Sequence, residues 1–265
     1  MRVTYSILNP TGNLTALVET PVEETRQPSL AAALMEHCPE VEQVGFLSPG
    51  TLRMAGGEFC GNASMSAAAL FLLRGGRGEG RDPERVHLRV SGAGDPVEVR
   101  LWRESSCSFR AGVRMPRPLD LTERAFSFGT AAGVLPFARM EGISHLLVES
   151  GSPFFGLLED RAAAGQAVRQ WCGELSAQGL GLMFLGEDGR LIPLVYGPGS
   201  GTLFWENSCA SGTSVAGMLL AQRRGEPVSL VLTEPGGELR VESTPGGDTW
   251  LYGRVELVEQ NSLDL

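Results

Sequence analysis

Two stretches, residues 60–73 (CGNASMSAAALFLL) and residues 209–220 (CASGTSVAGMLL), decide the fold of this chain. Both are apolar or small at almost every position, so a helix formed by either has no polar face to present to water. An Arg-Gly pair follows each stretch, at residues 74–75 and 224–225, which is the usual pattern at the end of a helix. The two stretches therefore predict two helices buried inside the core.

The two stretches also match each other when their cysteines are aligned. The paired positions are Cys60 with Cys209, Ser64 with Thr213, Ala67 with Ala216, and Leu70 with Leu219. An acidic residue precedes each cysteine, Glu58 and Glu206, and a strand, a glycine-rich turn and a second strand follow each helix. Such an internal repeat indicates an α+β fold of two pseudo-symmetric halves, each a curved mixed β-sheet around a central buried helix.

Other secondary structure follows from periodicity and turn residues. Short apolar or β-branched runs predict strands over residues 5–8, 14–19, 43–47, 86–90, 97–102, 146–149, 191–195, 229–233, 239–242 and 251–258. Amphipathic patterns predict surface helices over residues 29–37 and 162–178, and glycine-rich or charged segments predict loops over residues 74–83 and 197–201.

The repeat also suggests how the chain divides into domains. We expect an N-terminal half over residues 1–115 and a C-terminal half over residues 116–249. A final strand over about residues 250–265 returns to the first half in this prediction. The active-site cleft is predicted between the two halves.

Composition excludes several classes of function. The 265 residues carry a formal net charge of −9, and Lys and Arg do not cluster as they do in proteins that bind nucleic acid. An acidic surface also repels anionic membranes, and no apolar run is long enough to span one. The first residues lack the apolar core of a signal peptide. We therefore expect a cytoplasmic protein whose partner is a small molecule.

The chain has five cysteines: Cys38, Cys60, Cys107, Cys172 and Cys209. An odd number at irregular spacing does not suggest a disulfide framework. There is no CxxC pair and the three histidines are scattered, so we predict no metal site. By default each cysteine is a small hydrophobic residue of the core.

Cys60 and Cys209 differ from the others because each opens a predicted buried helix. The positive end of the helix dipole lowers the pKa of a thiol from about 8.5, so we expect thiolate near neutral pH. The unpaired N–H groups of the first helical turn also bind anions such as a carboxylate.

If the two helix starts face each other, one sulfur lies on each side of a bound amino acid's α-carbon. The helix N–H groups would stabilise the charge that develops on the carboxylate when the α-proton is removed. One cysteine then takes the proton as thiolate, and the other returns a proton to the opposite face as thiol. The predicted reaction is amino-acid racemisation without pyridoxal phosphate, metal or any other cofactor.

Four segments resemble the superfamily of diaminopimelate epimerase and proline racemase, and most closely the histidine racemases of staphylopine-type metallophore biosynthesis. They are residues 9–15 (NPTGNLT), 42–46 (EQVGF), 54–63 (MAGGEFCGNA) and 205–213 (WENSCASGT). The resemblance runs over most of the chain and implies a diaminopimelate epimerase-like fold. It also implies proton transfer by paired thiol and thiolate.

The resemblance also implies roles for individual residues. The two catalytic cysteines of the superfamily fall on Cys60 and Cys209. The backbone amides that bind the substrate carboxylate fall on Gly61, Asn62, Ala210 and Ser211. Further substrate contacts fall on Asn13 and Glu206. The alternative interpretations are a turn residue after Gly12 for Asn13 and a helix N-terminal charge for Glu206.

Departures from the superfamily bear on the substrate. Diaminopimelate epimerases bind the distal carboxylate with an arginine in a Glu-Arg-Gly segment, where this chain has residues 196–199 (YGPG). Their Gly-Asn-Pro-His run corresponds to residues 151–154 (GSPF). Both differences disfavour diaminopimelate. Histidine is implied by the family alone, because residues 117–189, which could line the side-chain pocket, match it least.

Three alternatives stay open beside a histidine racemase. The first is a diaminopimelate epimerase or a racemase of another amino acid. A second is an isomerase of the phenazine-biosynthesis type, which shares the fold but lacks the two cysteines. The third is a non-catalytic amino-acid-binding protein, which would not need two thiols. A homodimer is a further expectation.

Overall fold

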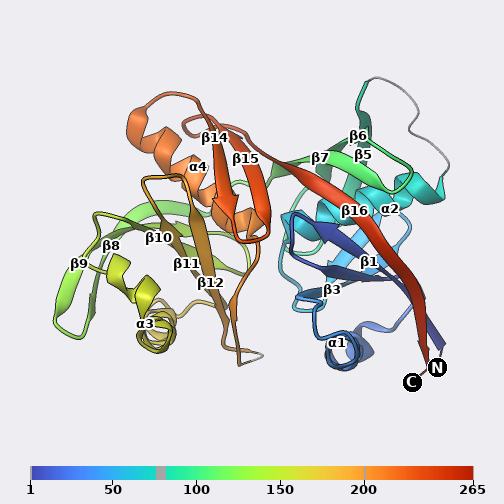
Figure 1. Cartoon of the computed structure of the whole chain (residues 1–265), viewed down its shortest axis with the longest axis horizontal. Helices are drawn as coiled ribbons and strands as arrows, with labels where there is room; N and C mark the ends of the chain where they lie inside the picture. Colours follow the sequence, from blue (N-terminus) through green and yellow to red (C-terminus); the bar gives the residue numbers. More distant parts are fainter. Residues whose placement is uncertain (1, 76–81, 200, 265) are drawn as a thin grey trace. The chain divides into compact units, whose positions relative to one another are not determined.

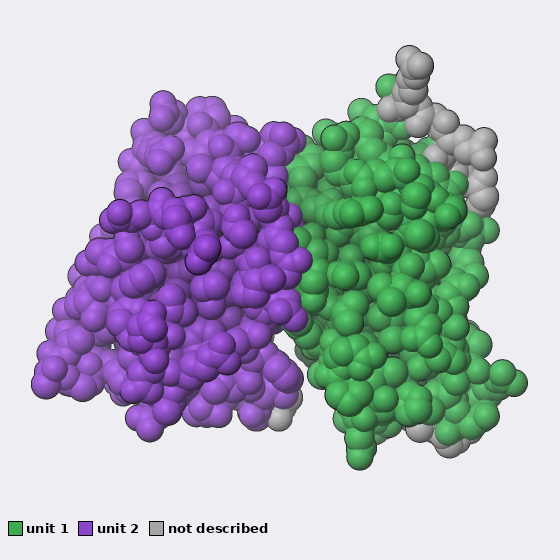
Figure 2. Space-filling view, viewed as in Figure 1, with its two compact units in different colours: residues 1–115, 250–265 green, residues 116–249 purple. Residues whose placement is uncertain are grey.

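The computed structural model describes residues 2–75, 82–199 and 201–264. The chain divides into two compact units, shown in different colours in Figure 2. Unit 1 comprises Met1–Met115 and Trp250–Leu265, and unit 2 comprises Pro116–Thr249. Each unit has its own central helix.

Unit 1 is built on a sheet that closes on itself. Its strands are β1 (Arg2–Pro10), β2 (Thr15–Val18), β3 (Gln43–Ser48), β4 (Thr51–Met54), β5 (Glu84–Val90), β6 (Val97–Arg103), β7 (Ser108–Met115) and β16 (Thr249–Asp264). They neighbour one another in the order β1-β2-β3-β4-β5-β6-β7-β16, and β16 pairs antiparallel with β1 from Arg2↔Asp264 to Pro10↔Val255. The last strand therefore closes the ring that the first strand opens (Figure 1).

Helix α2 (Gly61–Arg74) is the centre of unit 1. It packs against β1, β2, β4, β5, β6 and β7, so the closed sheet surrounds it. Eleven of its fourteen residues are buried, as its sequence without a polar face predicts. Helix α1 (Gln27–His37) packs on β3 instead, and its four buried residues include Leu30 and Leu34. The predicted buried helix and the predicted surface helix are both confirmed.

Unit 2 repeats this plan around helix α4 (Ala210–Arg224). Its sheet contains β8 (Asp120–Phe128), β9 (Ala131–Arg139), β10 (Ser144–Glu149), β11 (Leu180–Leu185), β12 (Leu191–Gly197) and β13 (Thr202–Trp205). A hairpin of β14 (Val228–Glu234) and β15 (Gly237–Ser243) also contacts α4, as do β9, β10 and β11. The mixed α+β class predicted from the sequence is confirmed.

Helix α3 (Arg161–Glu174) packs on β11 and β12 of unit 2. Its fully buried Trp171 meets the rings of Phe126 and Phe154 at centroid distances of 5.2 and 5.0 Å. The predicted helix over residues 162–178 is four residues too long at its end. The chain leaves the helix after Glu174, and Ser176 adopts a left-handed conformation with φ 51°.

The two Arg-Gly helix ends form in different ways. Gly225 adopts the left-handed conformation, with φ 68°, and its N–H caps the carbonyls of Ala221 and Gln222. Gly75 keeps a right-handed conformation, with φ −81°, so glycine's freedom is needed at only one of the two ends.

The predicted loop over residues 74–83 includes residues 76–81, and the one over 197–201 includes residue 200. These positions lie outside the described residues.

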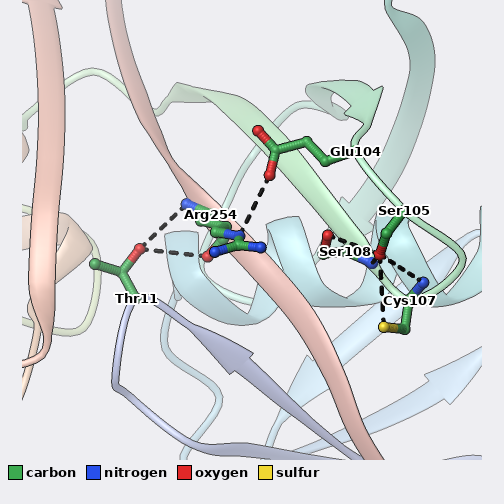
Figure 3. Close-up of polar contacts among 6 residues, drawn as sticks. All are labelled: Thr11, Glu104, Ser105, Cys107, Ser108 and Arg254. Carbon is green, nitrogen blue, oxygen red and sulfur yellow. Dashed lines mark hydrogen bonds and ion pairs between the residues drawn. The ribbon is translucent and has the colours of Figure 1, made fainter.

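The turn between β1 and β2 is attached to β16. The Thr11 hydroxyl donates to the Arg254 carbonyl and accepts from the Arg254 N–H, both at 3.3 Å, and the Arg254 side chain pairs with Glu104 at 3.3 Å (Figure 3). Thr11 and Gly12 both have positive φ, 54° and 87°. These contacts fix the turn that carries Asn13.

Candidate active site

Cys60 caps the N-terminus of α2 with its own side chain. Its backbone is extended, and its Sγ accepts a 3.3 Å hydrogen bond from the Ala63 N–H. The same Sγ lies 3.0 Å from Oε1 of Gln43 on β3. The thiol is half-buried and is positioned by both a helix start and a strand.

A chain of polar groups leads away from Cys60. The Gln43 amide donates to Thr15 Oγ1 at 2.8 Å, and that hydroxyl donates to the Asn13 carbonyl at 3.1 Å. The buried Asn13 side chain donates in turn to Glu42 Oε2 at 2.9 Å. Asn13, which the sequence suggested as a substrate contact, therefore belongs to the same network as Cys60. Gln43 was not among the predicted site residues, although it lies in one of the matching segments.

Gly61 and Asn62, two of the predicted carboxylate-binding residues, are the first residues of α2. Both are buried at the end of the helix where Cys60 lies. Backbone N–H groups in the first turn of a helix have no partner within that helix. Binding of a carboxylate by the backbone of Gly61 and Asn62 stays a prediction.

The turn after β5 packs directly against the peptide that precedes Cys60. Ser91 Oγ donates to the Glu58 carbonyl at 2.9 Å and accepts from the Met54 N–H at 2.9 Å. A Cβ atom on Gly92, whose φ is +69°, would lie 2.2 Å from the Phe59 nitrogen. Only a glycine allows this close approach without displacing the backbone next to Cys60.

Cys209 is the N-cap residue of α4 and is buried, with 6% of its surface exposed. Its backbone N–H donates to Glu234 Oε2 at 2.7 Å, and the Thr213 hydroxyl donates to the other oxygen of the same carboxyl group. The turn after β14 also contacts the approach to the cysteine, since the Gly236 N–H donates to the Asn207 carbonyl at 2.8 Å. In each unit, therefore, the turn after the strand that follows the central helix contacts the residues just before the cysteine.

Burial decides the ionisation of Cys209. Loss of water raises the pKa of this thiol well above its ordinary value, and the carboxylates of Glu206 and Glu234 raise it further. Hydrogen bonds from the Gly212 N–H and from Ser211 act in the opposite direction but are weaker. The expectation that the helix start makes Cys209 a thiolate near neutral pH is therefore wrong for the free protein, because desolvation outweighs the helix dipole.

Two titratable residues near Cys209, Glu234 and His145, were not predicted from the sequence as site residues. Burial raises the pKa of Glu234 to about 8, and burial lowers the pKa of His145 to about 3. The His145 Nε2 atom lies 2.9 Å from Ser211 Oγ, which in turn lies 3.6 Å from Cys209 Sγ. Ser211, predicted only for its backbone amide, thus also places its hydroxyl between an imidazole and a thiol.

The remaining predicted residues of unit 2 lie close to Cys209 along the chain. Ala210 is buried as the first residue of α4, and the Glu206 N–H donates to the Pro193 carbonyl at 3.1 Å. The negative charge of the Glu206 carboxylate raises the pKa of Cys209. Each unit therefore groups one cysteine with the predicted residues around it.

The other three cysteines have structural surroundings. Cys172 is buried in α3 and its thiol donates to the Ala177 carbonyl at 3.3 Å. Cys38 is half-buried beside the Tyr5 hydroxyl at 3.6 Å, and Cys107 lies in the β6–β7 turn with Ser105 (Figure 3). All five cysteines are free thiols.

The chain is similar to known proteins over almost its whole length. The model of one protein family, described as histidine racemase CntK N-terminal domain, matches residues 2–258. A histidine racemase of Fusobacterium nucleatum is 27% identical over 264 residues, covering 97% of this chain and 95% of that protein. A histidine racemase of Staphylococcus aureus is 27% identical over 278 residues, with coverage of 97% and 95%.

Solved structures share the fold at lower identity. A probable proline racemase from Agrobacterium radiobacter, solved with bound carbonate, superposes with a TM-score of 0.74 at 13% identity. The match covers 99% of this chain and 93% of that one. Such low identity shows the fold alone, which agrees with the class predicted from the sequence. None of the helices in the described ranges has the length and apolar content needed to span a bilayer.

Proposed function

Because this chain belongs to the histidine racemase family, whose model matches residues 2–258, we propose that it interconverts L-histidine and D-histidine without a cofactor. The family makes it an isomerase of amino acids. One observation carries the mechanism: each unit places a cysteine at the N-cap of its central buried helix, Cys60 on α2 and Cys209 on α4.

The substrate carboxylate binds to backbone N–H groups at the helix starts in this proposal. Gly61 and Asn62 on α2, and Ala210 and Ser211 on α4, supply these donors. The α-proton of an amino acid is weakly acidic, and its removal places negative charge on the carboxylate oxygens. Donors that are already oriented stabilise this charge more than water does, because they need not reorganise during the reaction.

Two thiols then move the protons. Cys60 acts as thiolate in one direction and removes the α-proton, while the Cys209 thiol donates its proton to the opposite face of the α-carbon. The C–H bond that breaks gives its proton to one sulfur, and the new C–H bond takes its proton from the other. The raised pKa of Cys209 supports the assignment of this residue as the thiol of the free enzyme.

Glu206 is proposed to attract the substrate's ammonium group. Its carboxylate is close enough to raise the pKa of Cys209, so it carries an unfavourable negative charge next to the site of thiolate formation. A bound ammonium group would compensate this charge. Substrate binding would then lower the pKa of Cys209 towards the value that proton transfer requires. Asn13 is proposed to contact the substrate from the Cys60 network.

The direct test follows the α-proton. The protein is incubated with L-histidine in heavy water, NMR measures loss of the α-proton signal, and chiral chromatography measures formation of D-histidine. We expect both, with the mixture approaching equal amounts of the two enantiomers. A panel of other amino acids, including proline and diaminopimelate, tests the substrate. Tight binding of histidine without exchange would instead identify a binding protein.

A homodimer stays a prediction, to be tested by analytical ultracentrifugation.

A further inference from the structure

His145 is a buried titratable residue that the mechanism above does not use. It lies on β10, its side chain is 0% exposed, and its Nε2 atom is 2.9 Å from Ser211 Oγ at the start of α4. Ser211 Oγ is also 3.6 Å from Cys209 Sγ. The three side chains, all from unit 2, form a continuous polar path that ends at the thiol.

The other imidazole nitrogen determines how this path is polarised. His145 Nδ1 is buried and has no hydrogen-bond partner in the described part of the chain. A neutral imidazole carries its hydrogen on only one nitrogen. A buried N–H without an acceptor is rarer and costlier than an unused lone pair, so the hydrogen belongs on Nε2.

With its hydrogen on Nε2, His145 donates to Ser211 Oγ. That hydroxyl then has its own hydrogen free for its second neighbour, the sulfur of Cys209. With the hydrogen on Nδ1 instead, Ser211 would donate to His145 and could not stabilise the thiolate. The position of the hydrogen on His145 thus decides what the serine does.

We propose that His145 is a positioning residue for racemisation, which holds the Ser211 hydroxyl so that it donates to Cys209 Sγ when this sulfur is ionised. Burial keeps the imidazole neutral, because it lowers the pKa of His145 to about 3. The imidazole therefore keeps the same hydrogen-bonding role over the pH range in which thiols ionise. This inference rests on the proposed role of Cys209.

The neighbouring strand leaves room for the imidazole in this position. Gly181 on β11 pairs with His145, and a Cβ atom there would lie 2.5 Å from His145 Nδ1. The backbone of Gly181 does not have a positive φ, so its small size is what matters. An alanine at this position would displace the ring and so disturb its contact with Ser211.

The first test measures the ionisation of Cys209 without using turnover. Ultraviolet absorbance of thiolate is followed against pH, and the curve of Cys209→Ala is subtracted to isolate this residue. We expect Ser211→Ala and His145→Phe each to raise the midpoint by about one to two pH units. His145→Gln keeps an N–H donor and should restore much of the original midpoint. Ser214→Ala is the matched control, since this serine donates to the Ala210 carbonyl instead.

The second test asks whether His145 acts through Ser211. Racemisation by His145→Phe should fall about tenfold to one-hundredfold, but His145→Phe added to Ser211→Ala should cause no further loss. Thermal melting verifies that each variant is folded. If His145→Phe does not fold, Gly181→Ala is used in its place to disturb the contact between His145 and Ser211. Additive losses, or an unchanged Cys209 midpoint in a folded His145→Phe protein, would overturn the proposal. Absence of racemisation in the unaltered protein would refute the proposed function but leave the titration result standing.

Discussion

The backbone N–H of Cys209 donates a 2.7 Å hydrogen bond to Oε2 of Glu234, which lies 25 residues further along the chain. Glu234 is only 3% exposed, and its carboxyl group also accepts from the Thr213 hydroxyl. Glu234 therefore fixes both the N-cap and the first turn of α4. A buried acid at this point connects the stability of unit 2 to pH.

The first prediction concerns Glu234→Gln. Burial raises the pKa of Glu234 from 4.5 in the unfolded chain to about 8, so the folded protein holds an extra proton between these values. The stabilisation is complete below about pH 4.5 and is lost as the pH rises towards 8, with a slope of at most about 1.4 kcal/mol per pH unit. Urea unfolding across this range should show a smaller slope for Glu234→Gln. An identical slope would contradict the assignment.

The second prediction concerns the two cysteines. Cys60→Ala and Cys209→Ala should each reduce racemisation by roughly a thousandfold, because each removes one of the two proton-transfer groups. The remaining thiol can still exchange the α-proton of one enantiomer in heavy water. The two variants should therefore exchange opposite enantiomers of histidine. Cys172→Ala, in the core of α3, is the control. Exchange of the same enantiomer by both variants would contradict a two-base mechanism.

A third prediction tests whether both sulfurs reach the same substrate. The mechanism requires Cys60 and Cys209 to lie on opposite sides of one α-carbon. A short reagent with two thiol-reactive ends should then join them, and peptide mass mapping should identify the bridged pair. Histidine should slow the reaction by occupying the site. Alkylation of the two cysteines without any bridged product would count against their convergence.

The fourth prediction uses two glycines with similar backbone conformations. Gly92→Ala and Gly50→Ala both place a Cβ on a residue with φ near +70°, which costs about 1–2 kcal/mol. Gly50 has open space around it, whereas the new atom at Gly92 would strike the Phe59 backbone. Thermal unfolding should show the larger loss of stability for Gly92→Ala, and racemisation should fall in this variant only. Equal effects would mean that the turn after β5 does not support Cys60.

The fifth prediction concerns Gln43, whose amide oxygen is 3.0 Å from Cys60 Sγ. Once Cys60 has taken the α-proton, its thiol can donate to this oxygen. Gln43→Leu should therefore lower racemisation about tenfold, the effect of one lost hydrogen bond of about 1.4 kcal/mol. The free energy of unfolding should change by less than the free energy that corresponds to the loss in racemisation rate. Gln27→Leu, which alters a buried amide that donates to the Val22 carbonyl, is the control and should affect stability without affecting turnover.

Much of the fold can be predicted from sequence because the central helices and most strands carry local signals. Every predicted strand overlaps an observed one, but β4, β7, β8, β9, β11 and β13 were missed. Strand β9 contains Gly133 and Pro136, residues that argue against a strand interior. Its partner β8 has four exposed residues in a row and no clear alternation. Pairing with each other, a tertiary effect, overrides these local preferences.

The site was predictable only in part. Cys60 and Cys209 are marked by the repeat, whereas Glu234 and His145 reach Cys209 through contacts between distant segments. One signal for Glu234 is visible in the sequence. Alternation along β14 puts it on the same face as Val228 and Leu232, an unusual place for an acid. His145 sits in a run that is buried on both faces, where alternation gives no information.

The pairing of β16 with β1 has a consequence for biosynthesis. Residues 116–249 are continuous along the chain, so unit 2 can assemble as soon as this stretch leaves the ribosome. The ring of unit 1 remains open between β7 and β1 until residues 249–264 have been translated, so β1 keeps an unpaired edge throughout this interval. The second half of the polypeptide is thus ready to fold before the first half can be completed. Premature termination would release a nascent protein whose N-terminal strand has an unpaired edge that can pair with other chains.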